Sequence, residues 1–116
     1  MEATVAFKNI DGKLKVIGTK ENGQVNPTLI SKTDAAYILT VINDDANTHM
    51  FYIDGINIHT KLLRAGENDI ITIYSKTQGS YNYYDRLPSV GSQQENGTKA
   101  EPIGQFKVLK VAGNEW

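Results

Sequence analysis

Apolar and polar residues alternate along much of this chain, and a period of two is typical of half-buried β-strands. Near the N-terminus, Val5 and Phe7 begin such an alternation. After the dipeptide Asp11-Gly12 it resumes at Leu14 and Val16. Asp-Gly is a strong signal for a two-residue hairpin turn, because both of its positions tolerate a positive φ. We therefore expect an N-terminal β-hairpin.

Further runs rich in β-branched and aromatic residues predict strands in the rest of the chain. They cover residues 28–32, 36–43, 49–53, 70–74, 79–85 and 106–111, with turn signals at Asp34, Asp54-Gly55 and Ala65-Gly66. The run 36–43 has apolar residues on both faces, which indicates a central strand. Residues 86–104 are polar and contain Pro88, Gly91, Gly97 and Pro102, so we expect a long connection there.

The alternation also predicts which side chains share a face of each strand. It puts His49, Phe51 and Ile53 on one face of their strand. On the strand 79–85, Tyr83 and Asp85 share a face with Tyr81. These two faces supply the candidate functional residues discussed below.

Short strands separated by turns predict an all-β fold, namely an antiparallel Greek-key β-sandwich of about seven to eight strands. A parallel sheet would need crossover helices, and no segment has the pattern of a helix longer than a turn or two. The length of 116 residues fits a single domain over residues 1–116.

Composition excludes several classes of protein. The chain has no cysteine, which excludes disulfides, thiol nucleophiles and cysteine metal sites. Twelve basic and thirteen acidic residues give a formal charge of −1, so nothing favours binding to nucleic acid or to an anionic membrane. No apolar stretch approaches the roughly 20 residues of a membrane-spanning helix. The N-terminal residues also lack the basic and apolar regions of a secretion signal.

Four short motifs occur in the order seen in cupredoxins, and the chain resembles that family from about residue 26 to residue 111. The motifs are Asn26-Pro27-Thr28-Leu29, Leu39-Thr40-Val41-Ile42-Asn43, His49-Met50-Phe51 and Gly79-Ser80-Tyr81-Asn82-Tyr83-Tyr84. The likeness is closest to the copper domain of cytochrome c oxidase subunit II and its single-domain relatives. It implies a cupredoxin-like sandwich in an extracytoplasmic location, periplasmic or on the cell surface.

The resemblance also implies where copper ligands would lie, and most of them are missing. His49 matches the first histidine ligand, two residues ahead of a core aromatic. The cysteine that ends the tyrosine strand corresponds to Asp85. The second histidine falls within residues 87–90, and the axial methionine falls near Pro102, but neither residue type is present there. A blue copper centre needs a soft thiolate, so this chain departs from that pattern.

His49 and Asp85 therefore remain as candidate metal ligands, and three interpretations of them stay open. His49 could simply cap the core, with Asp85 ending its strand. The two side chains could instead form a carboxylate–imidazolium contact that fills the former metal position. A third interpretation is a hard, non-blue site for Cu(II) or Zn(II). Its further oxygen ligands would come from Asp44, Asp45, Glu95 or Glu101.

The remaining residues and motifs give weaker indications of a functional site. His59 lies in a stretch expected on the surface, and the six tyrosines favour cross-strand packing over a ligand platform, although Tyr84 is predicted on the face opposite Asp85. No phosphate-binding glycine loop, paired-histidine zinc helix or nucleophile elbow is present. We therefore expect no enzymatic activity.

Two hypotheses about function follow. The first is a cupredoxin-like binding or accessory module without a type 1 copper site, with a protein partner in a cell-envelope or oxidase assembly. The second is a non-blue metalloprotein with copper or zinc at His49 and Asp85, acting in copper handling or electron transfer. An engineered loss of the ligands is less favoured, because one substitution would suffice to abolish the centre.

Overall fold

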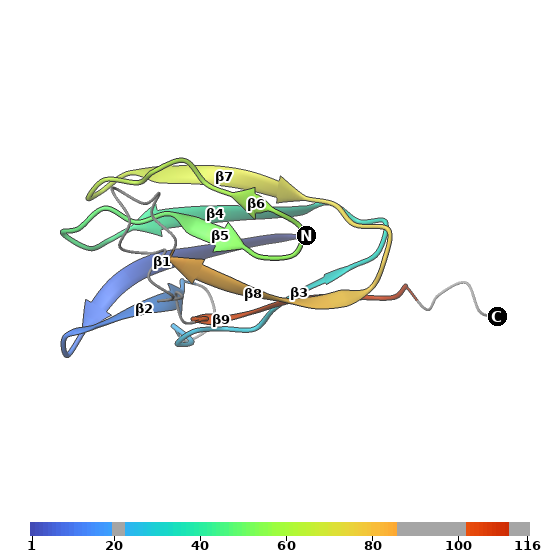
Figure 1. Ribbon diagram of the computed structural model, residues 1–116, viewed down its shortest axis with the longest axis horizontal. Helices are drawn as coiled ribbons and strands as arrows, with labels where there is room; N and C mark the ends of the chain where they lie inside the picture. The colour runs from blue at the N-terminus through green and yellow to red at the C-terminus, as the bar shows by residue number, and fades with distance from the viewer. Residues whose placement is uncertain (20–22, 86–101, 112–116) are drawn as a thin grey trace, which may run out of the picture.

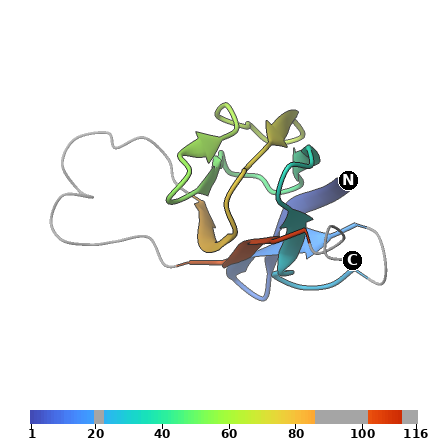
Figure 2. The ribbon, with the colours of Figure 1, turned by 90° about the vertical axis from the view of Figure 1, so that its right-hand side faces the viewer.

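Two β-sheets pack against each other in the part of the chain that the computed structural model describes, residues 1–19, 23–85 and 102–111 (Figure 1). The first sheet has the order β2-β1-β4-β7, with β1 (Glu2–Ile10), β2 (Lys13–Gly18), β4 (Tyr37–Asn43) and β7 (Asn68–Ile73). The second has the order β3-β9-β8-β5-β6, with β3 (Leu29–Lys32), β5 (Phe51–Ile53), β6 (Ile58–His59), β8 (Gly79–Asp85) and β9 (Gly104–Leu109). Figure 2 looks along the long axis, with the strands of both sheets around a common interior. Among the described segments, no helix has the length and apolar character needed to cross a membrane.

The strands predicted from alternation are present in the structure, with small differences in their bounds. β1 and β2 make the N-terminal hairpin, in which Phe7 lies opposite Val16. The turn residues Asp11 and Gly12 have φ of 54° and 83°, as the hairpin signal requires. β4 lies between β1 and β7, so the prediction of a central strand is confirmed.

The predicted all-β sandwich is confirmed, but one detail of its topology is wrong. The sandwich is not purely antiparallel, because β1 runs parallel to β4 and β3 runs parallel to β9. The strands of each pair are separated in sequence by strands of the other sheet, so no crossover helix is needed. The described residues also form nine strands, because the two-residue strand β6 is too short to show alternation. Most of the expected polar connection, residues 86–101, lies outside the described residues.

Aromatic and aliphatic side chains from both sheets form the core. Leu39, Phe51 and Tyr83 are fully buried, and the rings of Phe51 and Tyr83 stack with their centroids 4.8 Å apart. Tyr83 has its polar end satisfied, because its hydroxyl donates to the carbonyl oxygen of Pro27 over 2.6 Å. Burial raises the pKa of Tyr83, so the phenol stays protonated and can donate this bond.

The tyrosine rings of β8 lie over glycines. A Cβ atom added to Gly104 would overlap the hydroxyl and ring of Tyr83, its cross-strand neighbour. Added Cβ atoms at Gly55 and Gly79 would similarly overlap the ring of Tyr81. Glycine at these positions thus gives each ring the space to lie flat on the neighbouring backbone.

We expect the Gly104→Ala variant to be less stable than the native protein by about 1–3 kcal/mol, because the new methyl group must displace a fully buried ring. Urea unfolding followed by tyrosine fluorescence measures the change. Gly18→Ala is the matched control, since its Cβ would meet no atom closer than 3.7 Å. An equal effect in both variants would contradict the role assigned to the Tyr83 ring.

Candidate functional site

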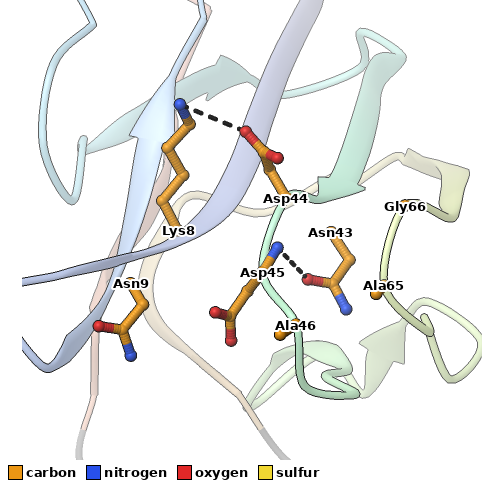
Figure 3. A pocket seen from close by; sticks show the side chains of 8 residues that line it. All are labelled: Lys8, Asn9, Asn43, Asp44, Asp45, Ala46, Ala65 and Gly66. Carbon is orange, nitrogen blue, oxygen red and sulfur yellow. Dashed lines mark hydrogen bonds and ion pairs between the residues drawn. The ribbon is translucent and has the colours of Figure 1, made fainter.

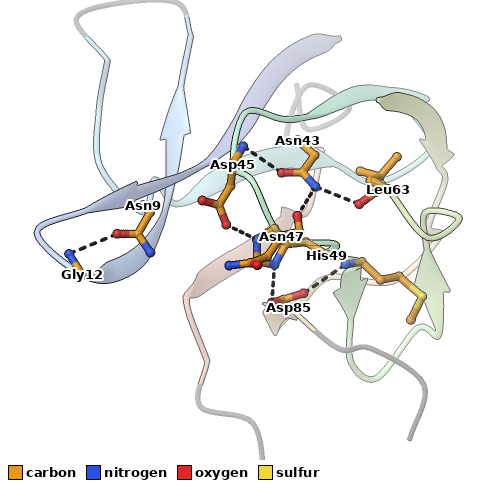
Figure 4. Close-up of polar contacts among 9 residues, drawn as sticks. Asn9, Gly12, Asn43, Asp45, Asn47, His49, Leu63 and Asp85 are labelled. Carbon is orange, nitrogen blue, oxygen red and sulfur yellow. Dashed lines mark hydrogen bonds and ion pairs between the residues drawn. The ribbon is translucent and has the colours of Figure 1, made fainter. Parts of the chain in front are cut away.

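The buried side chain of Asn43, the last residue of β4, organises the loop that leads to His49. Its amide nitrogen donates to the carbonyl oxygens of Asn47 over 2.7 Å and of Leu63 over 2.8 Å. Its amide oxygen accepts from the backbone N–H of Asp45 over 3.0 Å. Leu63 also exchanges two backbone hydrogen bonds with His49. These bonds fix the loop that carries Asp45 and His49 (Figure 4).

The imidazole of His49 lies between two carboxylates. Its Nδ1 is 2.7 Å from Oδ2 of Asp85, and its Nε2 is 2.6 Å from Oδ2 of Asp45. The second oxygen of Asp85 accepts from the backbone N–H of Met50 over 3.0 Å. Side-chain exposure is 8% for His49, 9% for Asp45 and 21% for Asp85. The ring is thus buried and has a polar partner on each side.

Each of the two nitrogen–oxygen contacts of His49 requires a proton between the two atoms. An ionised carboxylate can only accept a hydrogen bond, whereas a neutral imidazole has one donor nitrogen and one acceptor nitrogen. Two contacts of hydrogen-bond length therefore need two protons shared among His49, Asp45 and Asp85. The doubly protonated ring between two ionised carboxylates meets this requirement and leaves one net negative charge.

The face of the imidazole packs against Phe7 of β1, with ring centroids 4.9 Å apart and an angle of 29° between the planes. A protonated ring is attracted by the negative face of an aromatic side chain. Phe7 and Asp85 belong to strands of different sheets, so the His49 cluster (Asp45, His49 and Asp85) joins the two sheets at this end of the molecule.

An open hollow of about 670 Å³ lies beside the His49 cluster. Figure 3 shows its lining, which comprises Lys8, Asn9, Asn43, Asp44, Asp45, Ala46, Ala65 and Gly66. The Nζ of Lys8 forms an ion pair with Asp44 over 3.3 Å, and both side chains are about half exposed or more. The carboxylate of Asp44 therefore pairs with Lys8 at the surface, whereas the neighbouring Asp45 pairs with His49.

The structure brings together the two residues that the sequence singled out, His49 and Asp85. Of the four acidic residues predicted as further partners, Asp45 joins them and Asp44 does not, while Glu95 and Glu101 lie outside the described residues. His59 is exposed as predicted, and its Nδ1 lies 2.8 Å from the carbonyl oxygen of Thr60. Sequence reasoning missed Asn43, whose signal is an asparagine that ends a buried strand directly before a polar loop.

Comparison with solved structures shows a shared architecture at low sequence identity. Rusticyanin from Thiobacillus ferrooxidans matches with a TM-score of 0.62 and 18% identity over 96% of this chain and 77% of its own. The apo form of a copper binding protein matches with 0.57 and 12%, over 92% and 85% of the two chains. This chain has the cupredoxin fold.

A larger cupredoxin-fold protein, copper nitrite reductase from Nitrosomonas europaea, matches with a TM-score of 0.64 and 16% identity. The match covers 98% of this chain and 43% of the reductase chain. No protein-family model and no curated protein matches the sequence.

The residues at the expected copper position do not fit a type 1 copper ion. The chain supplies no thiolate, and no group of three histidine or acidic side chains in the described ranges is arranged to hold a metal. Although the His49 cluster contains three such groups, its carboxylates contact opposite nitrogens of the ring and so cannot converge on one ion with it.

Asp45 should make the stability of the protein sensitive to acid. The hydrogen bond from His49 is the largest influence on Asp45 and holds its pKa below the usual value, although partial burial acts in the opposite direction. Because the folded-state pKa is lower than the unfolded one, ionised Asp45 stabilises the fold above about pH 4. This contribution is lost as the pH falls through the folded-state value.

We therefore expect Asp45→Asn to lower the free energy of unfolding at neutral pH, with a difference from the native protein that shrinks toward pH 3. Urea unfolding at a series of pH values measures both curves. Asp44→Asn removes the same charge from the neighbouring exposed residue and is expected to change stability little at any pH. Parallel curves for the native protein and Asp45→Asn would contradict this role of Asp45.

Proposed function

We propose that the protein is a cupredoxin-fold binding or accessory module in which a hydrogen-bonded cluster replaces the type 1 copper centre. The observation that supports this most is the occupation of both ring nitrogens of His49 by Asp45 and Asp85. A type 1 site needs a histidine nitrogen free to coordinate and a thiolate beside it. Here a carboxylate stands at the thiolate position and binds a proton on the ring instead.

In this proposal the His49 cluster acts as a structural element of the scaffold. A buried imidazole is costly unless its polar atoms have partners, and here each nitrogen has one. The cluster also fixes the end of β8 against the loop after β4. The surface loops around it are then available for recognition, as in many domains that carry binding functions on a rigid scaffold.

The partner class that we propose is a protein of a cell-envelope or oxidase assembly, in an extracytoplasmic compartment. This rests on the resemblance of the sequence to cupredoxins, together with the shared fold. No enzymatic step is proposed, because the described site offers a closed hydrogen-bonded network rather than an activated nucleophile.

A non-blue metal site is the second candidate function, and the contact between His49 and Asp85 is the observation that favours it. A Cu(II) or Zn(II) ion could replace the proton shared by this nitrogen and oxygen, which are suitable ligand types for either metal. It would then need further ligands from Asp45 or from solvent, and the Asp45 bond to Nε2 would have to rearrange.

Metal titration separates the two candidates. Cu(II) and Zn(II) are added to the purified protein, with binding followed by calorimetry and, for copper, by electron paramagnetic resonance. We expect affinity no higher than that of an exposed histidine, and no intense visible absorption, since that band needs a thiolate. Weak binding at His59, which is exposed, should disappear in His59→Ala and persist in His49→Ala.

Tight binding of one ion per chain that is lost in His49→Ala and retained in His59→Ala would overturn the first proposal in favour of the second. His49→Ala leaves two carboxylates without their donor and can lose stability for that reason alone. Asp85→Asn is therefore included, because it removes the anionic ligand while its single amide oxygen keeps one of the two acceptor positions, and the ring of His49 stays in place. Unchanged metal binding in Asp85→Asn would argue against the metal site.

A further inference from the structure

Three lysines from separate segments line one hollow at the end of the sandwich opposite the His49 cluster. Lys32 ends β3, Lys76 lies in the connection from β7 to β8, and Lys110 follows β9. The hollow has a volume of about 710 Å³. β4 and β8 both begin at this end and finish at the other, as Figure 1 shows. This lysine hollow is therefore remote from the candidate metal position.

Backbone hydrogen bonds hold two of the lysine-bearing segments together. Lys32 pairs with Leu109 in the parallel register of β3 and β9. The backbone N–H of Thr33 donates to the carbonyl oxygen of Leu109 over 2.8 Å. The hydroxyl oxygen of Thr33, a buried residue, accepts from the backbone N–H of Val111 over 3.0 Å. The main-chain positions of Lys32 and Lys110 are thus fixed relative to each other.

The third segment is attached to the first two. The backbone N–H of Asp34 donates to the carbonyl oxygen of Ser75 over 2.9 Å. The hydroxyl of Ser75 donates to the carbonyl oxygen of Thr77 and accepts from its N–H, so Lys76 lies in a closed turn. Figure 2 faces this end of the molecule and shows the β3–β4 connection close to the start of β8 and the end of β9.

None of the three lysines of the hollow forms an ion pair among the described residues. The ion pairs of the described residues all lie at the other end of the sandwich, where they involve Lys8 and His49. The single acidic lining residue is Asp34, whose carboxylate accepts from the hydroxyl of Tyr74 over 3.3 Å. Three lysines and one aspartate give this hollow a charge of +2, in a chain whose total is −1.

We propose that the lysine hollow binds a small multivalent oxyanion, carrying phosphate or carboxylate groups. Such an anion relieves the repulsion between the three ammonium groups, and Thr77 and Gln78 add polar side chains to the lining. The volume is in the range of small-molecule sites. The near-neutral charge of the whole chain argues against an extended polyanion such as nucleic acid, which needs a long basic surface.

Binding of pyrophosphate and of citrate to the full chain, measured by calorimetry at low ionic strength, tests this inference. We expect each of Lys32→Gln, Lys76→Gln and Lys110→Gln to weaken binding about two- to fivefold, which corresponds to one exposed ion pair. The triple variant is expected to abolish binding, and added sodium chloride to weaken it, through charge screening. The probe that binds more tightly identifies phosphate or carboxylate as the preferred group.

Lys13→Gln is the matched control, because it removes the same charge from the exposed hairpin at the opposite end. It is expected to leave the affinity for both probes unchanged. Failure of both anions to bind the native protein, or equal weakening by Lys13→Gln and by the hollow variants, would overturn the proposal. These results do not depend on whether His49 holds a metal, so they test the hollow independently of the proposed function.

Discussion

The arrangement around His49 depends on one constraint, namely that both nitrogens of a buried imidazole contact carboxylates. Two protons must then be shared by Asp45, His49 and Asp85. Because Asp85 ends a strand of one sheet and Asp45 follows a strand of the other, this requirement also joins the sheets. Phe7 covers the ring and Asn43 shapes the loop, so the neighbouring residues all support a single ring position.

A metal ion and a shared proton solve the same structural problem in different ways. In a copper-binding cupredoxin the ion would tie the histidine to the strand that ends with the cysteine. In this chain Asp85 ties the loop that carries His49 to the end of β8 through a hydrogen bond. The fold can therefore form without a thiolate, and the fold alone is no argument for electron transfer.

Much of the fold could be predicted from alternation and turn residues, because burial on one face imposes a period of two. Parity put Asp85 on the same face as Tyr83, and only the resemblance to cupredoxins suggested that it lies near His49; in the structure Phe51 and Asp85 are cross-strand partners. Alternation specifies a face and not a neighbour, so the parallel pairs were missed. It also could not distinguish Asp44 from Asp45, because loop geometry decides which carboxylate reaches the ring.

The two ends of the sandwich are built by different connections and differ in how their charges are balanced. At the His49 end, the partly buried carboxylates have an internal hydrogen-bond donor in His49, so that site is complete without a ligand. At the lysine end, main-chain hydrogen bonds hold three lysine-bearing segments around a hollow that has a single acidic lining residue. Since neighbouring like charges favour an opposite charge from solution, binding of a small anion is better supported at the lysine end than at the His49 cluster.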